Sequence, residues 1–463
     1  CYRREISYMR IEVRNLGVIK QAEIDLRPLT IFIGPNNAGK TWLAYTLAGI
    51  LGRYGGRKYT RAYIVKDVQD RYPPLDAAIK QVLDEGNAKI DLVQFADQYG
   101  EIYINNVAQF AKHWMQEYLS TEMASFKNLE VHVDLAETKA GFLERILNQS
   151  WENKLGVGRS NRKPLLSVLK EPGKQELYMY TTSEESLSEK LPLRAVEEFL
   201  VNIVFGALNQ ALYPRIFTFP TERTTFTPFL AVEALQQEQK VGSTIEPVRQ
   251  FLGMIVTLFQ SSLSERAREA EDNAGIQNCM QLAQLLEKQI LHGDLDFSTP
   301  EPDPRRKILF HPTERTSLEI TIASSLVKEL SSLVLYLRYM AKPGDWLIID
   351  EPEMNLHPEA QARLTEFLAI LVKAGLRILI TTHSPYIVDH LTNLIKAAES
   401  MEPGAMQDLF YLQNKNAFIS KDDVSVYLVD LGTTRSVLDE EGVIHWSTFG
   451  NVSDRVTEIY FEL

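Results

Sequence analysis

The residues best suited to chemistry lie in segments that are far apart in the sequence. The first segment has glycines near both ends and closes on a lysine and a threonine: Gly34-Pro35-Asn36-Asn37-Ala38-Gly39-Lys40-Thr41. Such glycines let the backbone curl so that successive N–H groups point at bound phosphates. The lysine adds a charge for the β- and γ-phosphates, and the threonine hydroxyl can bind Mg²⁺. We therefore predict a nucleotide-binding loop that continues into Trp42.

The second segment is an apolar run, Trp346–Ile349, that leads into Asp350-Glu351-Pro352. The run predicts a buried parallel strand. A carboxylate at the end of such a strand faces the crevice where ligands bind in open α/β sheets. We expect Asp350 to hold Mg²⁺ and Glu351 to orient or deprotonate a water molecule. Without the phosphate loop, an acidic turn before a proline would be the ordinary interpretation.

A third segment repeats this arrangement. The β-branched run Arg377–Thr382 is followed by His383-Ser384-Pro385, and the intervening Pro358–Gly375 has helical spacing. A strand–helix–strand unit of this kind places its strands side by side and parallel. The sequence therefore predicts that Asp350, Glu351 and His383 emerge at one edge of the sheet.

The residues Asp350–Pro358, Thr381–Pro385 and Met9–Gly17 resemble the ATPase heads of the ABC/SMC/RecF group. They are most similar to the stand-alone prokaryotic AAA-type ATP-binding proteins related to the OLD family. The resemblance implies an α/β fold, namely an ABC-type P-loop ATPase head (mixed sheet with flanking helices) with mostly helical insertions. It also implies that ATP and Mg²⁺ are bound, that Glu351 is the base and that His383 reads the γ-phosphate. Such heads work as head-to-tail dimers with ATP between them.

One motif departs from that pattern. A Ser-Gly-Gly-like turn should open the helix before the Asp350 strand, and the chain has Ala323-Ser324-Ser325-Leu326 there. The Ser324 hydroxyl could still reach a nucleotide of the other subunit. Leu326 replaces a glycine that would let the backbone approach a phosphate. An ordinary serine-capped amphipathic helix is the alternative.

Composition limits the class of protein. The chain has 463 residues, 45% of them hydrophobic, so we expect a large core in about two or three units. Cys1 and Cys279 give neither a disulfide framework nor metal-binding spacing, which is consistent with a cytoplasmic protein. No apolar run approaches about 18 residues, so no membrane span is expected. The first eight residues lack the apolar core of a signal peptide.

The net charge of −12 does not favour a dedicated nucleic-acid binder, although DNA binding stays possible. Local basic clusters qualify this expectation: Arg53 to Lys58 with Arg61; Arg159 with Arg162 and Lys163; and Arg305-Arg306-Lys307. Each is expected to be a solvated face. If they converge, they could form a stripe that contacts DNA.

The expected organisation alternates head segments with insertions: head lobe 9–56, mostly helical insertion 57–213, head strand 214–224, second helical segment 225–292 and head lobe 293–463. A break is expected at Gly52–Gly56. Within the insertion, Phe110, Trp114 and Tyr118 have helical spacing and could be core or interface. We expect the insertions to contact a partner or another subunit, or else to be packing elaborations.

Two look-alike segments, Pro220-Thr221-Glu222-Arg223-Thr224 and Pro312-Thr313-Glu314-Arg315-Thr316, are interpreted as coincidence. Arg223 follows a head strand, so it could reach a phosphate or a second subunit. Equally, it could pair with a carboxylate.

The leading hypothesis is an ABC-type, Mg²⁺-dependent ATPase whose nucleotide state drives dimer or partner rearrangement. The resemblance implies a homodimer or higher oligomer, prokaryotic defence against phage or plasmids, and a separately encoded effector. The alternative is a RecF-like DNA-repair or chromosome-associated ATPase. An OLD-type nuclease is disfavoured, because residues 384–463 show no strand-end glutamate paired with a later Asp-x-Asp.

Overall fold

The computed structural model describes residues 8–121, 126–135, 138–157, 163–181, 192–213, 215–226, 245–400, 403–446 and 458–459. The chain forms two compact units. The first comprises Cys1–Val13, Gly49–Trp114 and Lys127–Pro214, and the second comprises Arg14–Ala48, Met115–Phe126 and Arg215–Leu463. The expectations for Cys1, for Arg159 and Arg162, and for most of 447–463 lie outside the described residues.

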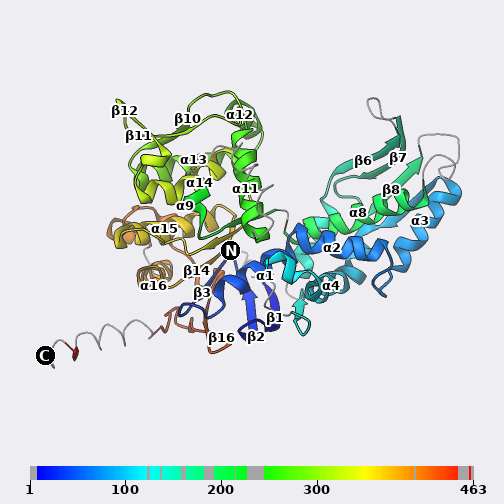
Figure 1. Cartoon of the computed structure of the whole chain (residues 1–463), viewed down its shortest axis with the longest axis horizontal. Coiled ribbons are helices and arrows are strands. Elements are labelled where there is room, and N and C mark those ends of the chain that lie inside the picture. Colours follow the sequence, from blue (N-terminus) through cyan, green and yellow to red (C-terminus); the bar gives the residue numbers. More distant parts are fainter. Residues whose placement is uncertain are drawn as a thin grey trace. The chain divides into compact units, whose positions relative to one another are not determined.

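The second unit is built on a mixed sheet (Figure 1). Its strands are β2 (Ile19–Leu26), β3 (Leu29–Ile33), β9 (Ile216–Phe219), β13 (Trp346–Asp350), β14 (Arg377–Thr382), β15 (Val424–Asp430) and β16 (Thr433–Ser436). They run in the order β2-β16-β15-β3-β14-β13-β9. The preceding strand β1 (Met9–Leu16) contributes residues to both units.

The centre of this sheet is parallel. Strand β14 lies between β3 and β13, with Thr382 opposite Ile33 and Thr381 opposite Asp350. Strands β9 and β15 are also parallel to their neighbours β13 and β3. The predicted parallel pairing of the Asp350 and His383 strands is therefore confirmed. Every residue of β3 and β13 is buried, as expected for strands covered on both faces.

Four helices begin in this unit, each directly after a loop that carries a candidate site residue: α1 (Lys40–Leu51), α14 (Ser325–Tyr339), α15 (Pro358–Lys373) and α16 (Pro385–Glu399). Local sequence explains where three of them start. The side chains of Ser324, His357 and Ser384 accept hydrogen bonds from the first turns of α14, α15 and α16. A proline follows the cap in α15 and α16, where its missing N–H costs nothing.

The remaining elements of the second unit include α5 (Met115–Tyr118), α9 (Arg223–Phe226), α11 (Glu246–Phe259), α12 (Leu263–Glu271), α13 (Ala274–Leu286) and the small sheet β10 (Asp294–Phe297), β11 (Ile308–Thr313) and β12 (Thr316–Glu319). The segment 225–292 was expected to be helical, and it forms helices from Glu246 onwards, whereas 227–244 lie outside the described residues. Cys279 is a free, buried thiol.

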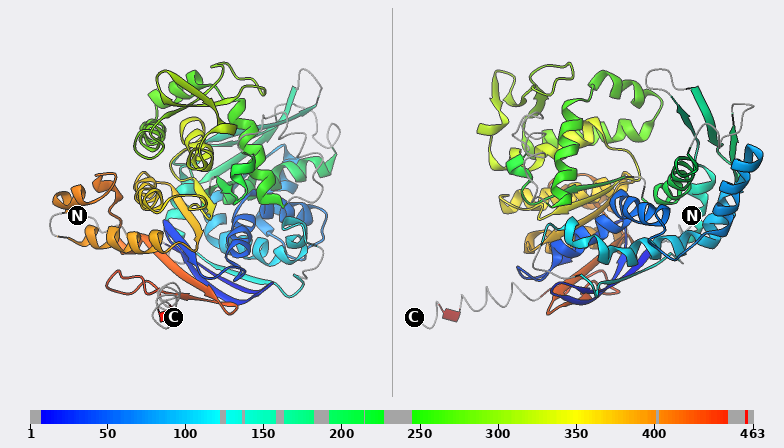
Figure 2. Two further views of the ribbon diagram at one scale, coloured as in Figure 1. Left: turned by 60° about the vertical axis from the view of Figure 1, so that its left-hand side comes forward. Right: turned by 45° about the vertical axis from the view of Figure 1, so that its right-hand side comes forward.

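The first unit combines helices with an antiparallel sheet, visible in Figure 2. Its elements are α2 (Arg53–Ile64), α3 (Pro73–Glu85), β4 (Asn87–Asp91), α4 (Leu92–Phe110), β5 (Glu130–Asp134), α6 (Lys139–Leu147), β6 (Trp151–Val157), β7 (Lys163–Lys170), β8 (Glu176–Thr181) and α8 (Leu193–Leu212). Aromatic rings fill its core. Phe205 of α8 contacts the rings of Tyr59, Tyr63, Tyr72 and Tyr103.

The predicted break at Gly52–Gly56 is confirmed only at Gly52, which separates α1 from α2, because α2 begins at Arg53 and runs through both Gly55 and Gly56. Gly55 and Gly56 allow neighbouring helices to pack closely against α2. A Cβ atom at Gly55 would lie 2.7 Å from the carbonyl oxygen of Gly49, and one at Gly56 would overlap Asn209 of α8. Two helices can therefore approach closely at this point, at the cost of some helix propensity.

The helix expected from the spacing of Phe110, Trp114 and Tyr118 is interrupted. Helix α4 ends at Phe110, a single 3₁₀ turn covers Ala111–His113, and α5 begins at Met115. Trp114 and Tyr118 are buried, whereas Phe110 is half-buried. The core interpretation of Trp114 and Tyr118 is confirmed, so this segment does not offer them as a docking face.

Among the described residues, α8 is long and apolar enough to cross a membrane by length and composition alone. Half of its most apolar window is buried within the protein. Its buried side chains include Leu200, Val204 and Leu208, which is the pattern of a core helix.

Candidate functional site

The candidate site lies where parallel strands of the second unit end. The phosphate loop follows β3, Asp350 and Glu351 follow β13, and His383 follows β14. Strand β9, the neighbour of β13, ends just before Thr221 and Arg223. Parallel strands end at the same edge of a sheet, so the structure brings together residues from four distant parts of the sequence.

The phosphate loop has the backbone that its glycines predict. Gly34 has φ +143°, and a Cβ atom there would collide with the carbonyl oxygen of Val429. Gly39, at φ +97°, leads into α1. The Lys40 ammonium donates to the carbonyl oxygens of Gly34 and Pro35, at 2.9 Å each. Burial lowers the pKa of Lys40, and the carboxylates of Glu351, Asp350 and Glu353 oppose that shift.

Asp350 is the most heavily hydrogen-bonded carboxylate of the site, and it is only 2% exposed. Thr41 Oγ1 lies 2.9 Å from its Oδ1, and Thr221 Oγ1 donates to its Oδ2 at 2.6 Å. Tyr45 and Thr381 donate to it as well. Burial raises the pKa of Tyr45 well above its ordinary value, and Asp350 adds to the shift, so the phenol keeps its proton.

The pair Thr41 and Asp350 fits a magnesium ion that is completed by a nucleotide. Mg²⁺ prefers hard oxygen ligands and commonly takes only one or two from the protein, with phosphates and water filling the rest. Within the described residues, no group of three or more His, Cys, Asp and Glu side chains could hold a metal ion by itself. The donor set is therefore that of a substrate-completed cation site, not of an all-protein cage.

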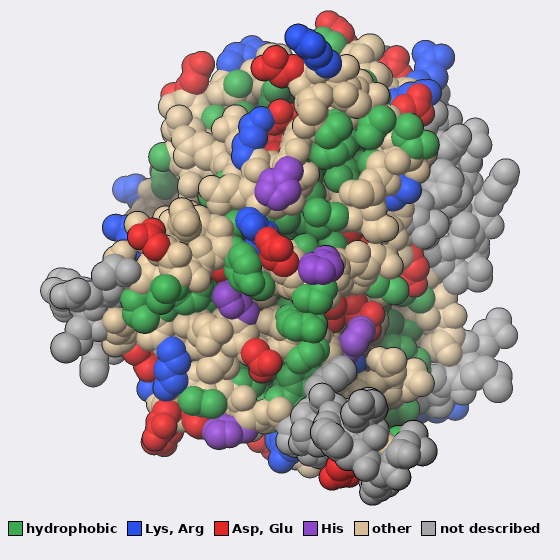
Figure 3. Space-filling view, turned by 90° about the vertical axis from the view of Figure 1, so that its left-hand side faces the viewer, with side chains coloured by type: hydrophobic (Ala, Val, Ile, Leu, Met, Phe, Trp, Pro, Cys, Tyr) green, Lys and Arg blue, Asp and Glu red, His purple; other side chains and the backbone are tan. Residues whose placement is uncertain are grey.

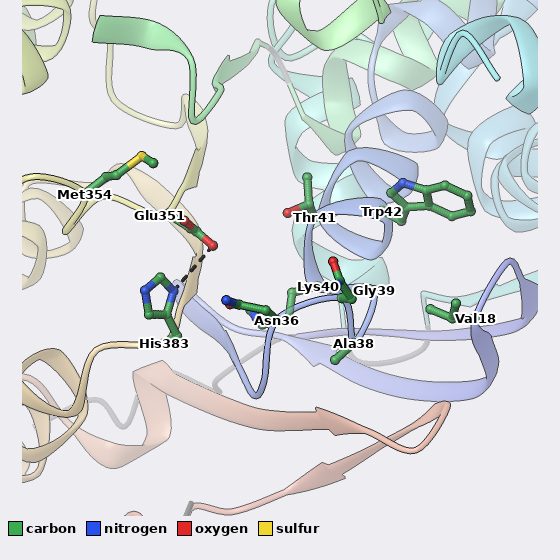
Figure 4. A pocket seen from close by; sticks show the side chains of 11 residues that line it. Val18, Asn36, Ala38, Gly39, Lys40, Thr41, Trp42, Glu351, Met354 and His383 are labelled. Carbon is green, nitrogen blue, oxygen red and sulfur yellow. Dashed lines mark ion pairs between the residues drawn. The ribbon is translucent and has the colours of Figure 1, made fainter. Parts of the chain in front are cut away.

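Glu351 and His383 lie next to each other in the site and form an ion pair, as Figure 4 shows. His383 Nδ1 lies 3.4 Å from Glu351 Oε1 and 3.7 Å from Glu353 Oε1. The oxygen Glu353 Oε1 also accepts from the His383 N–H at 2.9 Å and from Thr382 Oγ1 at 2.6 Å. Burial raises the pKa of Glu351, and the neighbouring His383 opposes the shift.

A cavity of about 790 Å³ opens between these groups. It is lined by Val18, Asn36, Asn37, Ala38, Gly39, Lys40, Thr41, Trp42, Glu351, Met354 and His383. In Figure 4, Val18 and Trp42 lie at one end, and Glu351 and His383 lie at the other. An apolar end suits a base, and an end with a lysine, a hydroxyl and carboxylates suits a triphosphate with its metal.

Most sequence-predicted residues meet at this cavity, but some do not line it. Gly34 and Pro35 accept hydrogen bonds from Lys40, and Asp350 accepts one from Thr41. Ser324 is exposed at the start of α14, where its hydroxyl accepts from the N–H of Val327 at 3.4 Å. In this chain Ser324 is thus a helix cap, and Leu326 packs against the hydrophobic core.

Sequence reasoning missed several residues of the site: Val18, Tyr45, Thr221, Glu353, Met354 and Thr381. Thr221 could have been found by the rule that found His383, because it also follows a head strand. Glu353 lies two residues after Glu351 in the same motif. Nothing in the sequence marks Val18, since it reaches the cavity from the turn between β1 and β2.

Arg223 has an interaction that one of the two interpretations anticipated. It forms a buried ion pair with Glu329 of α14 and donates to the carbonyl oxygens of Asp350 and Glu351. Its look-alike, Arg315, is exposed in the turn between β11 and β12. The two similar segments therefore have different structural roles.

One protein family matches most of the chain. The model of the AAA ATPase domain family matches residues 9–388. No curated protein matches the chain. Similar solved structures include an SMC head bound to the C-winged helix domain of ScpA (TM-score 0.39, 11% identity, 94% of this chain and 99% of that chain). Another is the SMC head domain from Thermotoga maritima (TM-score 0.30, 9% identity, 93% and 98%).

The family match contains the phosphate loop, the Asp350-Glu351 turn and His383. The closer relation to OLD proteins stays a prediction. With the loop, the acidic turn and the histidine joined at one cavity, the chain belongs to the AAA ATPase domain family of P-loop ATP hydrolases.

Proposed function

We propose that this protein is a Mg²⁺-dependent ATPase whose nucleotide state drives rearrangement of a dimer or a partner. One observation carries the proposal. The loop residue Thr41 lies 2.9 Å from the Asp350 carboxylate, and the next residue, Glu351, lines the same cavity as Lys40. The side chains proposed to bind phosphate, to bind the metal ion and to activate water are therefore adjacent.

In this proposal the loop Gly34–Thr41 binds the phosphates through its backbone N–H groups, and Lys40 supplies the positive charge. Val18 and Trp42 offer an apolar surface to the adenine ring of the nucleotide. A Cβ atom on Gly17 would collide with the Trp42 ring, so the ring lies against the backbone of the β1–β2 turn. The base would then rest between two elements that the fold already fixes.

Thr41 and Asp350 would hold the magnesium ion, which when bound neutralises charge on the phosphates. The hydrogen bonds of Thr221, Tyr45 and Thr381 fix the orientation of the Asp350 carboxylate. Such outer partners commonly matter almost as much as the ligands.

Glu351 would orient or deprotonate the attacking water, and His383 would contact the γ-phosphate. Burial raises the pKa of Glu351, which makes its carboxylate a better proton acceptor than an exposed glutamate. Glu353 holds the His383 backbone N–H, so the histidine approaches the cavity in a defined orientation.

The test is phosphate release from Mg-ATP by the purified chain and two variants. Lys40→Ala removes the phosphate charge and should abolish ATP binding. Glu351→Gln keeps the shape and loses the base, so ATP should bind with hydrolysis reduced by about 100-fold or more. Wild-type turnover in Glu351→Gln would remove Glu351 from the mechanism, and an inactive wild-type protein would contradict the proposal itself.

A dimer is the second part of the proposal, and Ser324 would act on the nucleotide of the other subunit. Exposed apolar side chains lie next to the elements concerned. Ile322 precedes α14 and is 71% exposed, and Met354 lines the cavity and is 39% exposed. Figure 3 shows a face of the molecule on which hydrophobic side chains gather, interspersed with histidines. Surfaces of this kind are typical of protein contacts.

The cellular role we propose is that of a cytoplasmic ATPase in prokaryotic defence against phage or plasmids, acting with a separately encoded effector. The insertions 57–213 and 225–292 would contact that partner. An adjacent gene for a nuclease or toxin would support this role. Neighbouring recombination genes would favour DNA repair instead.

A DNA-associated ATPase is the second candidate, and one observation favours it. Arg53, Arg57 and Arg61 are all exposed and recur every four residues along α2. They therefore form a row on one side of the helix. Arg306, in contrast, is buried over the ring of Phe297, so the expectation that it lies on a solvated face is wrong. Salt-dependent binding of duplex DNA that is lost in Arg57→Glu would support this candidate.

A further inference from the structure

The turn that carries Glu351 has an unusual backbone. Glu351 has φ +46°, a left-handed conformation that side-chain-bearing residues rarely adopt. Its N–H donates to the carbonyl oxygen of Thr381 at 3.1 Å and lies 3.2 Å from Thr381 Oγ1. Such a conformation persists only where the surroundings hold it in place. The N–H is held by β14, so something must also hold the carbonyl side of the turn.

Arg223 holds the carbonyl side of the turn that contains Glu351. Its Nη1 donates to the carbonyl oxygen of Asp350 at 2.6 Å and to that of Pro220 at 3.0 Å. Its Nη2 donates to the carbonyl oxygen of Glu351 at 2.9 Å. The planar fork of a guanidinium reaches two consecutive carbonyl groups at once, which a lysine ammonium does not reproduce. Arg223 is 2% exposed, so these bonds are shielded from water.

Glu329 anchors Arg223 from the opposite side. This carboxylate is 1% exposed on α14 and forms an ion pair with Arg223 Nη2. Glu329 therefore reaches the acidic turn through Arg223, whose other contacts include the carbonyl oxygens of Asp350 and Glu351.

A buried ion pair is a poor general stabiliser, because removing two charges from water costs about as much as their attraction returns. The Arg223–Glu329 pair instead contacts one turn, the one that contains Asp350 and Glu351. We propose that Arg223 and Glu329 are positioning residues for Glu351, and that they couple helix α14, which begins at Ser324, to the water-activating turn. The proposal rests on the function proposed above. A shift of α14 would reach the Glu351 backbone through the Arg223–Glu329 ion pair.

The test uses Arg223→Lys, which keeps the charge and loses the fork, and Glu329→Gln, which keeps the shape and loses the charge. The matched control is Arg315→Lys, in the look-alike segment that is exposed. Both test variants should lower kcat by about 30-fold, because small misplacements of a catalytic group cost about tenfold to a hundredfold. The dissociation constant for ATPγS with Mg²⁺ should stay within about threefold of wild type, because the phosphate loop is untouched.

A kcat within about twofold of wild type in both variants would overturn the proposal. So would a fall in kcat accompanied by an equal loss of ATPγS binding, since that outcome marks a general structural role. The control should match the wild-type protein in both measurements.

Hydrogen exchange gives a second readout that does not need hydrolysis. In both test variants, the peptide spanning 350–356 should exchange faster, including the Met354 N–H that donates to the Glu351 carbonyl at 3.2 Å. The peptide spanning 34–41 should not change. Unchanged exchange at 350–356 would refute the positioning pair even in an active enzyme. If the wild-type protein hydrolyses no ATP, the proposed function fails, and this measurement still decides whether the pair holds the turn.

Discussion

Thr221 Oγ1 donates a 2.6 Å hydrogen bond to Asp350 Oδ2, which joins the end of β9 to the end of β13. On the other side of the same carboxylate, Thr41 Oγ1 lies 2.9 Å from Oδ1. The carboxylate is therefore clamped between the phosphate loop and a strand that the sequence places 180 residues later.

Thr221→Val should lower the apparent affinity of the ATPase for magnesium. The substitution keeps the shape of the side chain and removes the donor, so the Asp350 carboxylate can rotate. Loss of such an outer partner commonly costs about tenfold to a hundredfold in metal affinity. A titration of ATPase activity with MgCl₂ should show a half-saturation point raised by about tenfold. Thr313→Val, at the equivalent position of the look-alike segment, is the control and should leave the titration unchanged.

Local patterns were sufficient to predict the edge of the sheet where the site forms. The apolar runs before Asp350 and His383 identified β13 and β14, and helical spacing identified α15 between them. Parallel strands then had to place both ends together. The roles proposed for single residues at this edge rest on the chemistry of their side chains and stay predictions.

Partners that come from distant segments could not be predicted in the same way. The pairing of Arg223 with Glu329 depends on how α14 packs beside β9, which no local pattern encodes. The helical conformation of Gly55 and Gly56 in α2 was not predicted for a related reason. Gly56 is required by the side chain of Asn209, far along the sequence, so its local preference for a turn was overridden.

Dimer formation should depend on ATP and on the apolar surface near Ser324. Glu351→Gln should change from monomer to dimer on adding Mg-ATP, as measured by light scattering. Ile322→Asp in that background should prevent the change, because it places a charge at the proposed contact. The control is Leu409→Asp, which alters another exposed apolar residue and should dimerise normally. A mass that stays monomeric with Mg-ATP would exclude a dimer with ATP between its subunits. A dimer that is present both with and without Mg-ATP would point to a different interface.

Glu329 should make stability depend on pH. Burial raises the pKa of Glu329 to about 7, and this effect outweighs the opposing charge of Arg223. A carboxyl whose pKa is raised by folding binds protons more tightly in the folded state. Its contribution to stability is therefore complete below its ordinary pKa of 4.5 and is lost as pH rises through about 7.

Urea denaturation at pH 5.5 and pH 8 can measure this. The free energy of unfolding of the wild-type protein should fall more between these two values than that of Glu329→Gln, which cannot titrate. Equal changes in the two proteins would show that Glu329 does not titrate in this range. Kinetic comparison of the two proteins belongs at pH 8, where the wild-type carboxylate is ionised.

The partner surface of the first unit should lie on its antiparallel sheet, not on the segment that carries Trp114 and Tyr118. Trp114 and Tyr118 are buried, whereas Tyr178 and Tyr180 of β8 are 38% and 37% exposed. Because side chains alternate along a strand, these two tyrosines lie on the same face of the sheet. Tyrosine is also among the residues that dominate protein interfaces. If the protein has the defence role proposed above, the double variant Tyr178→Ser, Tyr180→Ser should leave ATP hydrolysis unchanged and abolish protection of cells against phage. Substitution of exposed Leu193 by Ser in the same unit is the control for a general surface effect. Full protection by the double variant would move the partner surface elsewhere, and a parallel loss of ATP hydrolysis would show that these tyrosines support the fold of the unit instead.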